Sequence, residues 1–291
     1  MRVGIVSAGA MGSAIGRALR DGGTEVVTTL DGRSERTARM AREAGLECLP
    51  DLDAVVREAD VVLSVAPPDQ AEAIAGAIGA AATRMSASTL VADLNAISPA
   101  RARRVGTALA AAGLDLVDGS ISGPPPRKPG TTRIYLSGPR AAEVAELPFA
   151  GVQLVQVGDE VGTASAVKMC TASVYKGTVA LLAQALRTAR ANGVLEHVLD
   201  DLGELADGAA LTIERAATKS ERYVGEMHEI AATQAAAGLT PALFEAMAAV
   251  YAALAETPAA RKTPEDLSTE ELENVLAELT SRGGPRAPGR A

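Results

Sequence analysis

Residues Ser7–Gly12 are the first group in the chain whose types and spacing suit a defined chemistry. They read SAGAMG directly after the apolar segment Val3–Val6, which is the pattern G-x-G-x-x-G with serine at the first glycine. Where a strand turns sharply into a helix, free backbone N–H groups meet the positive end of the helix dipole, and Gly9 would let a pyrophosphate approach them. An ordinary strand–helix turn is the alternative, but the N-terminal position and the strand–helix rhythm that follows favour a dinucleotide site. The residues predicted to form it are Ser7, Ala8, Gly9, Ala10, Met11 and Gly12.

A second set of residues bears on the choice of coenzyme. Asp31 stands 24 residues after Ser7, at the end of the next predicted strand, and Arg33 and Ser34 follow it. An acidic side chain here holds the ribose hydroxyls of NAD, whereas an arginine holds the 2′-phosphate of NADP. Ser34 also suits the N-cap of a helix, and the two roles can coexist. The cation and hydroxyl favour NADP slightly, with NAD as the alternative. Further coenzyme contacts are predicted at later strand ends, at Ala66, Pro67 and Asn95, although an asparagine before Ser-Pro is also ordinary loop chemistry.

Lys168 is the one charged residue between Val161 and Tyr175, in a segment of otherwise small, polar and apolar residues with helical character. Desolvation lowers the pKa of a lysine toward neutrality, where the amine can accept and return the proton of a substrate hydroxyl during hydride transfer. Thr171 lies at +3 and Lys176 at +8, on broadly the same side of such a helix. The alternative is a lysine that extends from a buried helix to solvent.

The elements that must position these residues follow from the hydrophobic pattern. Short β-branched segments alternate with Ala-, Arg- and Glu-rich segments of helical period through the first half of the chain. Apolar strands joined by helices predict a parallel sheet covered on both faces, and therefore an α/β doubly wound (Rossmann) fold. From Gly158 onward the pattern is helical, with predicted stretches at Val161–Asn192, Val194–Thr218, Arg222–Ala237 and Pro241–Glu256.

These elements predict three parts of the chain. A Rossmann NAD(P)-binding domain is expected over residues 1–160, and an all-α domain for substrate binding and dimerisation over residues 161–280. Residues 281–291, rich in Gly, Pro and Arg, are expected to form a disordered tail. A cleft between the two domains would then hold the substrate.

Composition excludes several other classes of protein. The 291 residues are 47% hydrophobic and 22% charged, as in globular proteins. A net charge of −8 and a pI of about 5.0 argue against a nucleic-acid partner. Two cysteines without CxxC and two histidines without HxxH predict neither a disulfide framework nor a metal site. No apolar run reaches the ~20 residues of a membrane helix, and the N-terminus is unlike a signal peptide, so no membrane partner and a cytoplasmic location are expected.

Four segments together resemble the β-hydroxyacid dehydrogenase family, which includes 3-hydroxyisobutyrate and 6-phosphogluconate dehydrogenases. They are SAGAMG at Ser7–Gly12, DGSISG at Asp118–Gly123, GTASAVKMC at Gly162–Cys170 and VGEMHEIAATQAAAGL at Val224–Leu239. The resemblance covers nearly the whole chain and implies Lys168 as general acid/base, Ser122 and Gly123 as contacts of a substrate carboxylate, and a homodimer formed through the helical domain. Weaker candidates for substrate contact are Ser120, Thr171, Lys176 and Glu226.

Two positions depart from the family pattern. The family asparagine four residues after the catalytic lysine is Ala172 here, and a later family lysine is Gly225. We therefore predict an NAD(P)-dependent oxidoreductase that transfers a hydride between nicotinamide and a small β-hydroxy acid or related carbonyl compound, with an anionic small-molecule substrate left unnamed. One alternative is a 6-phosphogluconate-like decarboxylating dehydrogenase, which would need several cations around a phosphate. The other is a cofactor-binding regulator or inactive relative.

Overall fold

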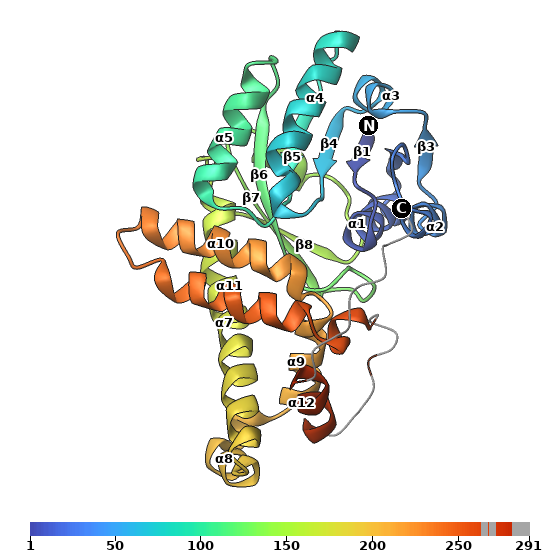
Figure 1. Ribbon diagram of the computed structural model, residues 1–291. Helices are drawn as coiled ribbons and strands as arrows, with labels where there is room; N and C mark the ends of the chain where they lie inside the picture. The colour runs from blue at the N-terminus through green and yellow to red at the C-terminus, as the bar shows by residue number, and fades with distance from the viewer. Residues whose placement is uncertain (263–266, 268–271, 281–291) are drawn as a thin grey trace. The chain divides into compact units, whose positions relative to one another are not determined.

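The computed structural model describes residues 1–262, 267 and 272–280 (Figure 1). The chain divides into two compact units, Met1–Met169 and Cys170–Ala291, and the division falls inside the long helix α7, Thr163–Ala191. The predicted boundary at residue 160 lies just before this helix, and the predicted domain limits stay a prediction. The predicted tail over 281–291 lies outside the described residues.

Within the described residues, the first unit is built on one eight-stranded sheet of order β3-β2-β1-β4-β5-β6-β7-β8. Neighbouring strands from β3 to β6 are parallel, β7 runs antiparallel to β6, and β8 is parallel to β7. The first six strands follow the order 3-2-1-4-5-6 of doubly wound dinucleotide-binding sheets, so the predicted fold class is confirmed. The strands are Arg2–Val6 (β1), Glu25–Thr29 (β2), Glu47–Leu49 (β3), Val61–Ser64 (β4), Leu90–Asp93 (β5), Leu116–Ser122 (β6), Thr132–Ser137 (β7) and Val152–Gln156 (β8).

The two faces of this sheet carry separate hydrophobic cores. Ile5 and Leu63 belong to a core shared with α1, α2 and α6, whereas Val6 and Val62 belong to a core shared with α3, α4 and α5. Alternate residues of a strand point to opposite faces, so each apolar strand feeds both layers of helices. These helices are Ala10–Asp21 (α1), Glu35–Glu43 (α2), Leu52–Glu58 (α3), Ala71–Met85 (α4), Pro99–Ala110 (α5) and Ala141–Ala145 (α6).

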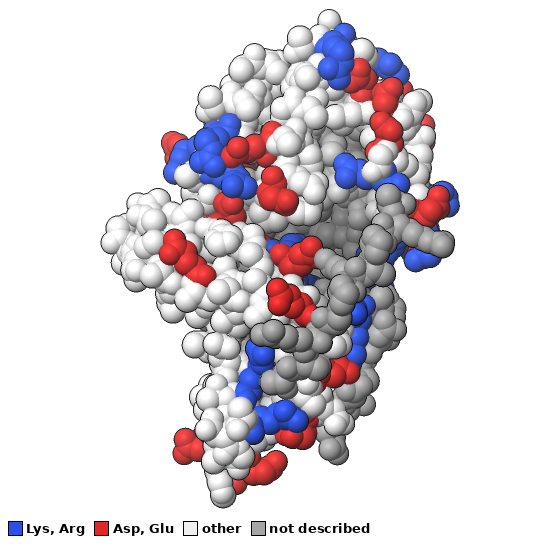
Figure 2. All heavy atoms as spheres, viewed as in Figure 1, with Lys and Arg blue, Asp and Glu red and all other residues white. Residues whose placement is uncertain are grey.

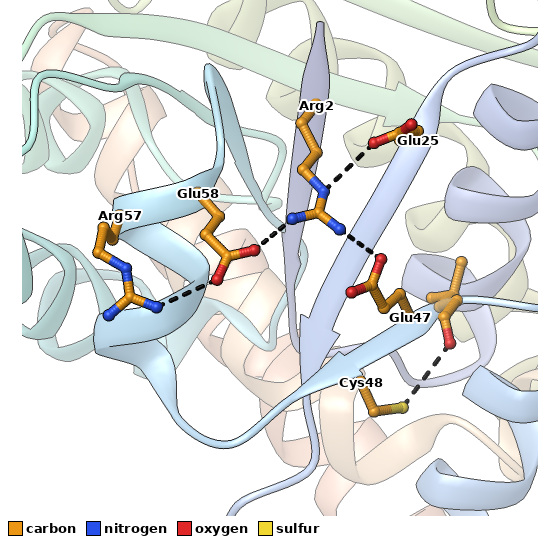
Figure 3. A network of polar contacts seen from close by, with 7 residues as sticks. Arg2, Glu25, Glu47, Cys48, Arg57 and Glu58 are labelled. Atoms are coloured by element: carbon orange, nitrogen blue, oxygen red, sulfur yellow. Dashed lines mark hydrogen bonds and ion pairs between the residues drawn. The ribbon is translucent and has the colours of Figure 1, made fainter.

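An ion cluster joins the strands at the edge of the sheet where the parallel strands begin (Figure 3). Arg2 donates hydrogen bonds to Glu58 of α3 and Glu47 of β3, and its Nε lies 3.5 Å from Glu25 of β2. Arg57 donates to Glu58 at 3.1 Å and extends the cluster. Doubly wound sheets bind ligands at the opposite edge, where the parallel strands end. We therefore assign the Arg2 cluster to stability and look for the functional site at the other edge.

The second unit is helical through its described part. Helix α10, Ser220–Ala236, packs against α11, Ala242–Ala255. Tyr251 of α11 is fully buried, contacts the ring of Tyr223 edge to face at 5.3 Å, and donates a hydrogen bond to the carbonyl of Lys176 at 2.8 Å. These contacts fix the α10–α11 pair against α7. The other helices are Leu195–Leu202 (α8), Ala209–Ala217 (α9) and Leu272–Thr280 (α12).

One predicted helix of this unit is wrong in extent. The stretch predicted over Val194–Thr218 is broken into α8, a short 3-10 helix at Gly203–Ala206, and α9. Gly203 and Gly208 have φ of 52° and 66°, a left-handed conformation that interrupts a right-handed helix. Among the helices of the described residues, none is both long and apolar enough for a membrane span.

Candidate active site

The turn from β1 into α1 has the backbone form of an anion-binding loop. Ser7 has a φ of 73°, the left-handed conformation that favours glycine, so the serine keeps the backbone shape that the first glycine of the fingerprint would have. A Cβ added to Gly12 would lie 2.3 Å from the carbonyl oxygen of Ser7, so a glycine is needed for α1 to pack this closely. A Cβ added to Gly9 would meet no atom within 4 Å. The space beside the start of α1 is therefore open.

The first turn of α1 suits an anionic group in that space. Gly9 is the N-cap, no side chain caps the helix, and the first turn contains no acidic residue. The first N–H groups of a helix have no intrahelical partner and carry partial positive charge, which a pyrophosphate would satisfy. Ala10 is exposed and Met11 half-buried, whereas Ala8 is buried and supplies only backbone. The residues present thus fit a dinucleotide, with the amides of Ala10 and Met11 as donors.

The end of β2 exposes the residues predicted to select the coenzyme. Asp31, Arg33 and Ser34 are all exposed, and a turn closed by a hydrogen bond of 3.0 Å from the Arg33 amide to the Leu30 carbonyl arranges them. Ser34 is the N-cap of α2, and its hydroxyl accepts from the Thr37 amide at 3.4 Å. The predicted capping role is confirmed, and the Ser34 hydroxyl also lies within hydrogen-bond distance, 3.3 Å, of the Thr37 hydroxyl.

Asn95 lies at the ends of β4 and β5 and is 2% exposed. Its side chain donates to Ser64 at 3.0 Å and to Asp93 at 2.8 Å, and it accepts from the Ala66 amide at 2.5 Å. These bonds fix the backbone of Ala66 and the following Pro67, which are both half-buried. The amide group of Asn95 is thus engaged in hydrogen bonds inside the protein. Its predicted direct contact with nicotinamide or substrate stays a prediction.

Asp93 at the end of β5 is a buried carboxyl that the sequence analysis did not single out. Burial raises its pKa to about 7, and the charge of Asp118 on the next strand acts in the same direction, against hydrogen bonds from Asn95 and Ser64. Asp93 and Asp118 are register partners on the parallel strands β5 and β6. Two carboxyls thus lie side by side at the functional edge of the sheet.

Lys168 lies next to the end of β6. Its Nζ donates a hydrogen bond of 2.7 Å to the carbonyl of Ile121, the residue directly before Ser122 and Gly123. Gly123 has a φ of 110°, and a Cβ there would lie 2.3 Å from the carbonyl oxygen of Thr131, so this turn requires glycine. Ser122 is half-buried. The structure therefore brings together Lys168, Ser122 and Gly123, the three residues for which the sequence predicted the main substrate roles.

Ser120 and Asp118 fasten this strand to the start of α7. The hydroxyl of Ser120, which is fully buried, donates to the Ala164 carbonyl at 2.8 Å, and its predicted role in substrate contact stays a prediction. Asp118 accepts hydrogen bonds from Ser137, from the amides of Gly162 and Ser165, and from the Ser165 hydroxyl. Burial raises the pKa of Asp118, and these hydrogen bonds oppose the rise.

The loop between β6 and β7 carries the exposed cation Arg127. Pro126 and Arg127 border a pocket of about 500 Å³ together with Ala10, Ser13 and Arg17 of α1 and the end of α2. Arg127 therefore lies on the side of the fingerprint helix, beside its first residue. This place suits a contact with the coenzyme better than a contact with a substrate at Lys168.

The other substrate candidates belong to the second unit. Lys176 of α7 and Glu226 of α10 form an ion pair, and Arg222 Nε lies 3.1 Å from Glu226. Lys176 also lies 4.3 Å from the ring centre of Tyr223. Glu226 is buried, and these two cations compensate its charge inside this unit. Thr171 is half-buried, Ala172 is buried, and a Cβ on Gly225 would meet no atom within 4 Å.

The fold and the fingerprint loop define a dinucleotide-binding protein, and comparison with known families places it further. Residues 2–147 match the NAD binding domain of 6-phosphogluconate dehydrogenase, and residues 189–254 match a domain of unknown function, DUF1932. The chain belongs to the β-hydroxyacid dehydrogenase family. It is an NAD(P)-dependent oxidoreductase of the dehydrogenase class that acts on CH–OH groups.

Individual relatives agree with this placement. The L-threonate dehydrogenase of Cupriavidus necator is 29% identical over 205 residues, which cover 69% of this chain and 68% of that protein. A conserved protein of unknown function, described as structurally similar to 3-hydroxyacid dehydrogenases, is 30% identical, with a TM-score of 0.66 over 87% of this chain and 96% of that one. A Mycobacterium tuberculosis 3-hydroxyisobutyrate dehydrogenase structure with L-serine shares the fold, with 20% identity and a TM-score of 0.68 over 96% and 99% of the two chains.

Proposed function

We propose that this protein transfers a hydride between a nicotinamide coenzyme and a small β-hydroxy acid or its carbonyl partner, with Lys168 as the general acid/base. The observation that carries the proposal is the hydrogen bond of 2.7 Å from Lys168 Nζ to the Ile121 carbonyl, which holds the amine beside Ser122 and Gly123. Family membership supplies the class of reaction. The position of the amine supplies the proton-transfer group that this reaction needs.

The chemistry of the lysine follows from the reaction. The nicotinamide coenzyme, when bound, accepts or supplies the hydride. In the direction of alcohol oxidation, the neutral amine of Lys168 accepts the hydroxyl proton as the carbinol carbon loses its hydride and becomes a carbonyl carbon. In the reverse direction the ammonium of Lys168 returns this proton to the carbonyl oxygen. The Ile121 carbonyl orients the amine by accepting a hydrogen bond from one of its N–H groups.

The substrate class rests on the groups around this amine. The hydroxyl of Ser122 and the backbone at Gly123 would bind a carboxylate, which places an acid group a short distance from the reacting carbon. The named relatives that act on 3-hydroxyisobutyrate and L-threonate support a small hydroxy acid. Ala172 and Gly225 replace the family asparagine and lysine, so we propose a substrate different from 3-hydroxyisobutyrate itself.

NADP is the coenzyme that we propose, with NAD as the alternative. Arg33 and the Ser34 hydroxyl are exposed at the end of β2, where a 2′-phosphate would lie in this fold. Arg36 on the first turn of α2 adds a second exposed cation. Asp31 is the opposing feature, because its carboxylate would repel a phosphate and would instead suit the free hydroxyls of NAD.

A homodimer formed through the helical unit is the partner that we propose, alongside the small anionic substrate and without nucleic acid or membrane partners. Apart from Met1, the large hydrophobic side chains that are exposed in the described residues all lie in the second unit, among them Val174, Tyr175 and Leu181 of α7 and Leu239 and Leu243 near the α10–α11 turn. Figure 2 shows few charged side chains over the α10–α11 pair on the face in view. Exposed apolar surface of this kind is typical of an interface. A cytoplasmic location is proposed with it.

The two alternative functions have less support. A 6-phosphogluconate-like enzyme would need free cations around a phosphate, but Lys176 is paired with Glu226 and Arg127 lies beside α1. A cofactor-binding regulator would bind the coenzyme but would not use Lys168, which is the point on which the two classes of function differ.

The test is turnover of a panel of 3-hydroxy acids, including 3-hydroxyisobutyrate and L-threonate, with both coenzymes. We expect Lys168→Ala to lower kcat by about 100-fold or more, as loss of a general acid/base does, with coenzyme affinity unchanged. Lys219→Ala, which removes an exposed lysine of the second unit, is the matched control and should keep the wild-type rate. Equal rates for wild type and Lys168→Ala would refute the role of the lysine, and coenzyme binding without turnover of any acid would favour the regulator.

A further inference from the structure

The start of α7 is bound to the sheet by a set of buried hydrogen bonds that the mechanism above does not use. Asp118 Oδ2 accepts from the amides of Gly162 at 2.9 Å and Ser165 at 3.0 Å, and its Oδ1 accepts from the Ser165 hydroxyl at 2.6 Å. Ser137 donates to the same carboxylate at 3.0 Å and accepts from the Ala164 amide at 3.0 Å. Asp118, Ser137 and Ser165 are each no more than 1% exposed. These bonds satisfy the N–H groups that the first turn of a helix leaves without partners.

The helix start and the proposed catalytic amine are one turn apart. Ser165 precedes Lys168 by three residues on α7, and Asp118 precedes Ile121, the carbonyl partner of Lys168, by three residues on β6. Gly162 has a φ of 107°, a backbone conformation that favours glycine, and a Cβ there would lie 3.2 Å from the carbonyl oxygen of Pro99. The carboxylate therefore sets the register of α7 against β6, and this register decides where the lysine amine lies.

We propose that Asp118 is a positioning residue of the active site, which holds the first turn of α7 so that Lys168 lies on the Ile121 carbonyl beside Ser122. This proposal rests on the proposed role of Lys168. Asp118 acts through the helix and not on the substrate, because its carboxylate is fully engaged with the start of α7 and with Ser137. Loss of the carboxylate would release the helix start and let the amine leave its place.

The isosteric variant provides an internal control. In Asp118→Asn, the amide oxygen can take the place of Oδ2 and accept from Ser137, Gly162 and Ser165. The amide nitrogen can take the place of Oδ1 and donate to the Ser165 hydroxyl, which serves as donor or acceptor. Asp118→Asn should therefore keep the register and a kcat within a few-fold of wild type. Asp118→Ala removes all four acceptor contacts and should lower kcat by about 100-fold, the scale expected when a reacting group is misplaced by about 1 Å.

A double-mutant cycle separates positioning from general loss of structure. If Asp118 acts through the lysine, Asp118→Ala combined with Lys168→Ala should be no slower than Lys168→Ala alone. Coenzyme affinity should be unchanged in Asp118→Ala, because the fingerprint loop makes no hydrogen bond with this network. Ser165→Ala removes one hydroxyl and keeps the backbone bonds, so it supplies a milder variant if Asp118→Ala fails to fold.

Labelling of the lysines with acetic anhydride, read by mass spectrometry, tests the proposal without substrate or turnover. In wild type and Asp118→Asn, Lys168 should react several-fold more slowly than the exposed Lys128 of the same chain, and in Asp118→Ala this protection should be lost. If Lys168 is labelled as slowly in folded Asp118→Ala as in wild type, the positioning role is overturned. Where Asp118→Ala does not fold, unchanged labelling of Lys168 in Ser165→Ala has the same meaning. Full turnover by Lys168→Ala would instead refute the proposed function, whatever the labelling shows.

Discussion

Replacing Asp93 with asparagine should change how the stability of the protein depends on pH. Asp93 is 2% exposed, and burial together with the charge of Asp118 raises its pKa to about 7. An aspartate in an unfolded chain has a pKa of about 3.9. Between these two values the native state holds a proton that the unfolded state has already lost, so protons favour the native state over this range.

The size and direction of the effect follow from linkage. Where the native state binds more protons, the free energy of unfolding falls as the pH rises. The contribution of Asp93 is therefore fully present below about pH 4 and is lost as the pH rises through about 7. A separation of about three pKa units, at about 1.4 kcal/mol each, amounts to about 4 kcal/mol. An asparagine does not titrate, so the stability of wild type minus that of Asp93→Asn should fall by about 4 kcal/mol between roughly pH 4 and pH 8.

Urea unfolding of both proteins, followed by far-UV circular dichroism across this range, measures the difference directly. Comparison of the two proteins cancels the titration of the shared groups that do not interact with Asp93, whereas Asp118, its neighbour on β6, contributes to the measured difference. A difference that stays constant within about 0.5 kcal/mol, the error of additivity between such variants, would show that Asp93 is ionised throughout. The raised pKa, and the burial that causes it, would then be refuted.

Three further substitutions test separate parts of the account. Ser7→Gly should stabilise the protein by about 0.5–1 kcal/mol, because relief of the left-handed φ of 73° outweighs the extra entropy of glycine, and a lower melting temperature would contradict this. Arg33→Ala should weaken binding of NADPH by about tenfold, as loss of one charged phosphate contact does, and leave NADH unaffected; an equal effect on both coenzymes would remove the arginine from the 2′-phosphate site. Leu181→Asp should convert the proposed dimer to a monomer in sedimentation, because it puts a charge on the exposed apolar side of α7, and a dimer formed by both proteins would place the interface elsewhere.

The general architecture could be predicted from the sequence because it depends on pattern. Strands that are almost wholly apolar, such as VVLS at Val61–Ser64, alternate with amphipathic helices, and this alternation of strand and helix predicts the doubly wound sheet. The turn at Ser7 was predicted from the surrounding strand–helix pattern although the residue is not glycine, and the structure places Ser7 between β1 and α1 with a φ of 73°. The break between α8 and α9 was missed, since Gly203 and Gly208 stop a helix only through their backbone conformation, which the helical period does not reveal.

The hydrogen-bond network of the site could not be predicted in the same way. The family resemblance pointed to Lys168, Ser122 and Gly123 as candidates. The hydrogen bonds that join β6 to α7 link residues 47 positions apart, Asp118 with Ser165 and Ile121 with Lys168. A signal was present all the same, because a charged residue inside an apolar strand must find compensation when it is buried. Asp93 in VADL and Asp118 in LVDG are such residues. The donors that compensate each carboxyl depend on the register of the neighbouring strands and of α7 against β6, and the sequence alone does not give this register.

Fluorescence titration of wild type and Gly9→Val with NADPH and NADH tests whether the start of α1 binds a nicotinamide coenzyme. A Cβ on Gly9 meets no atom within 4 Å, and its φ of −70° is open to other residues, so the variant should fold. Its melting temperature should fall only slightly, because valine is a poorer N-cap than glycine. The account predicts that wild type binds one of the reduced coenzymes and that Gly9→Val has lost at least about tenfold in affinity, because its side chain fills the space where the pyrophosphate approaches the helix. Equal affinity of the two proteins, or no binding by the wild type, would contradict it.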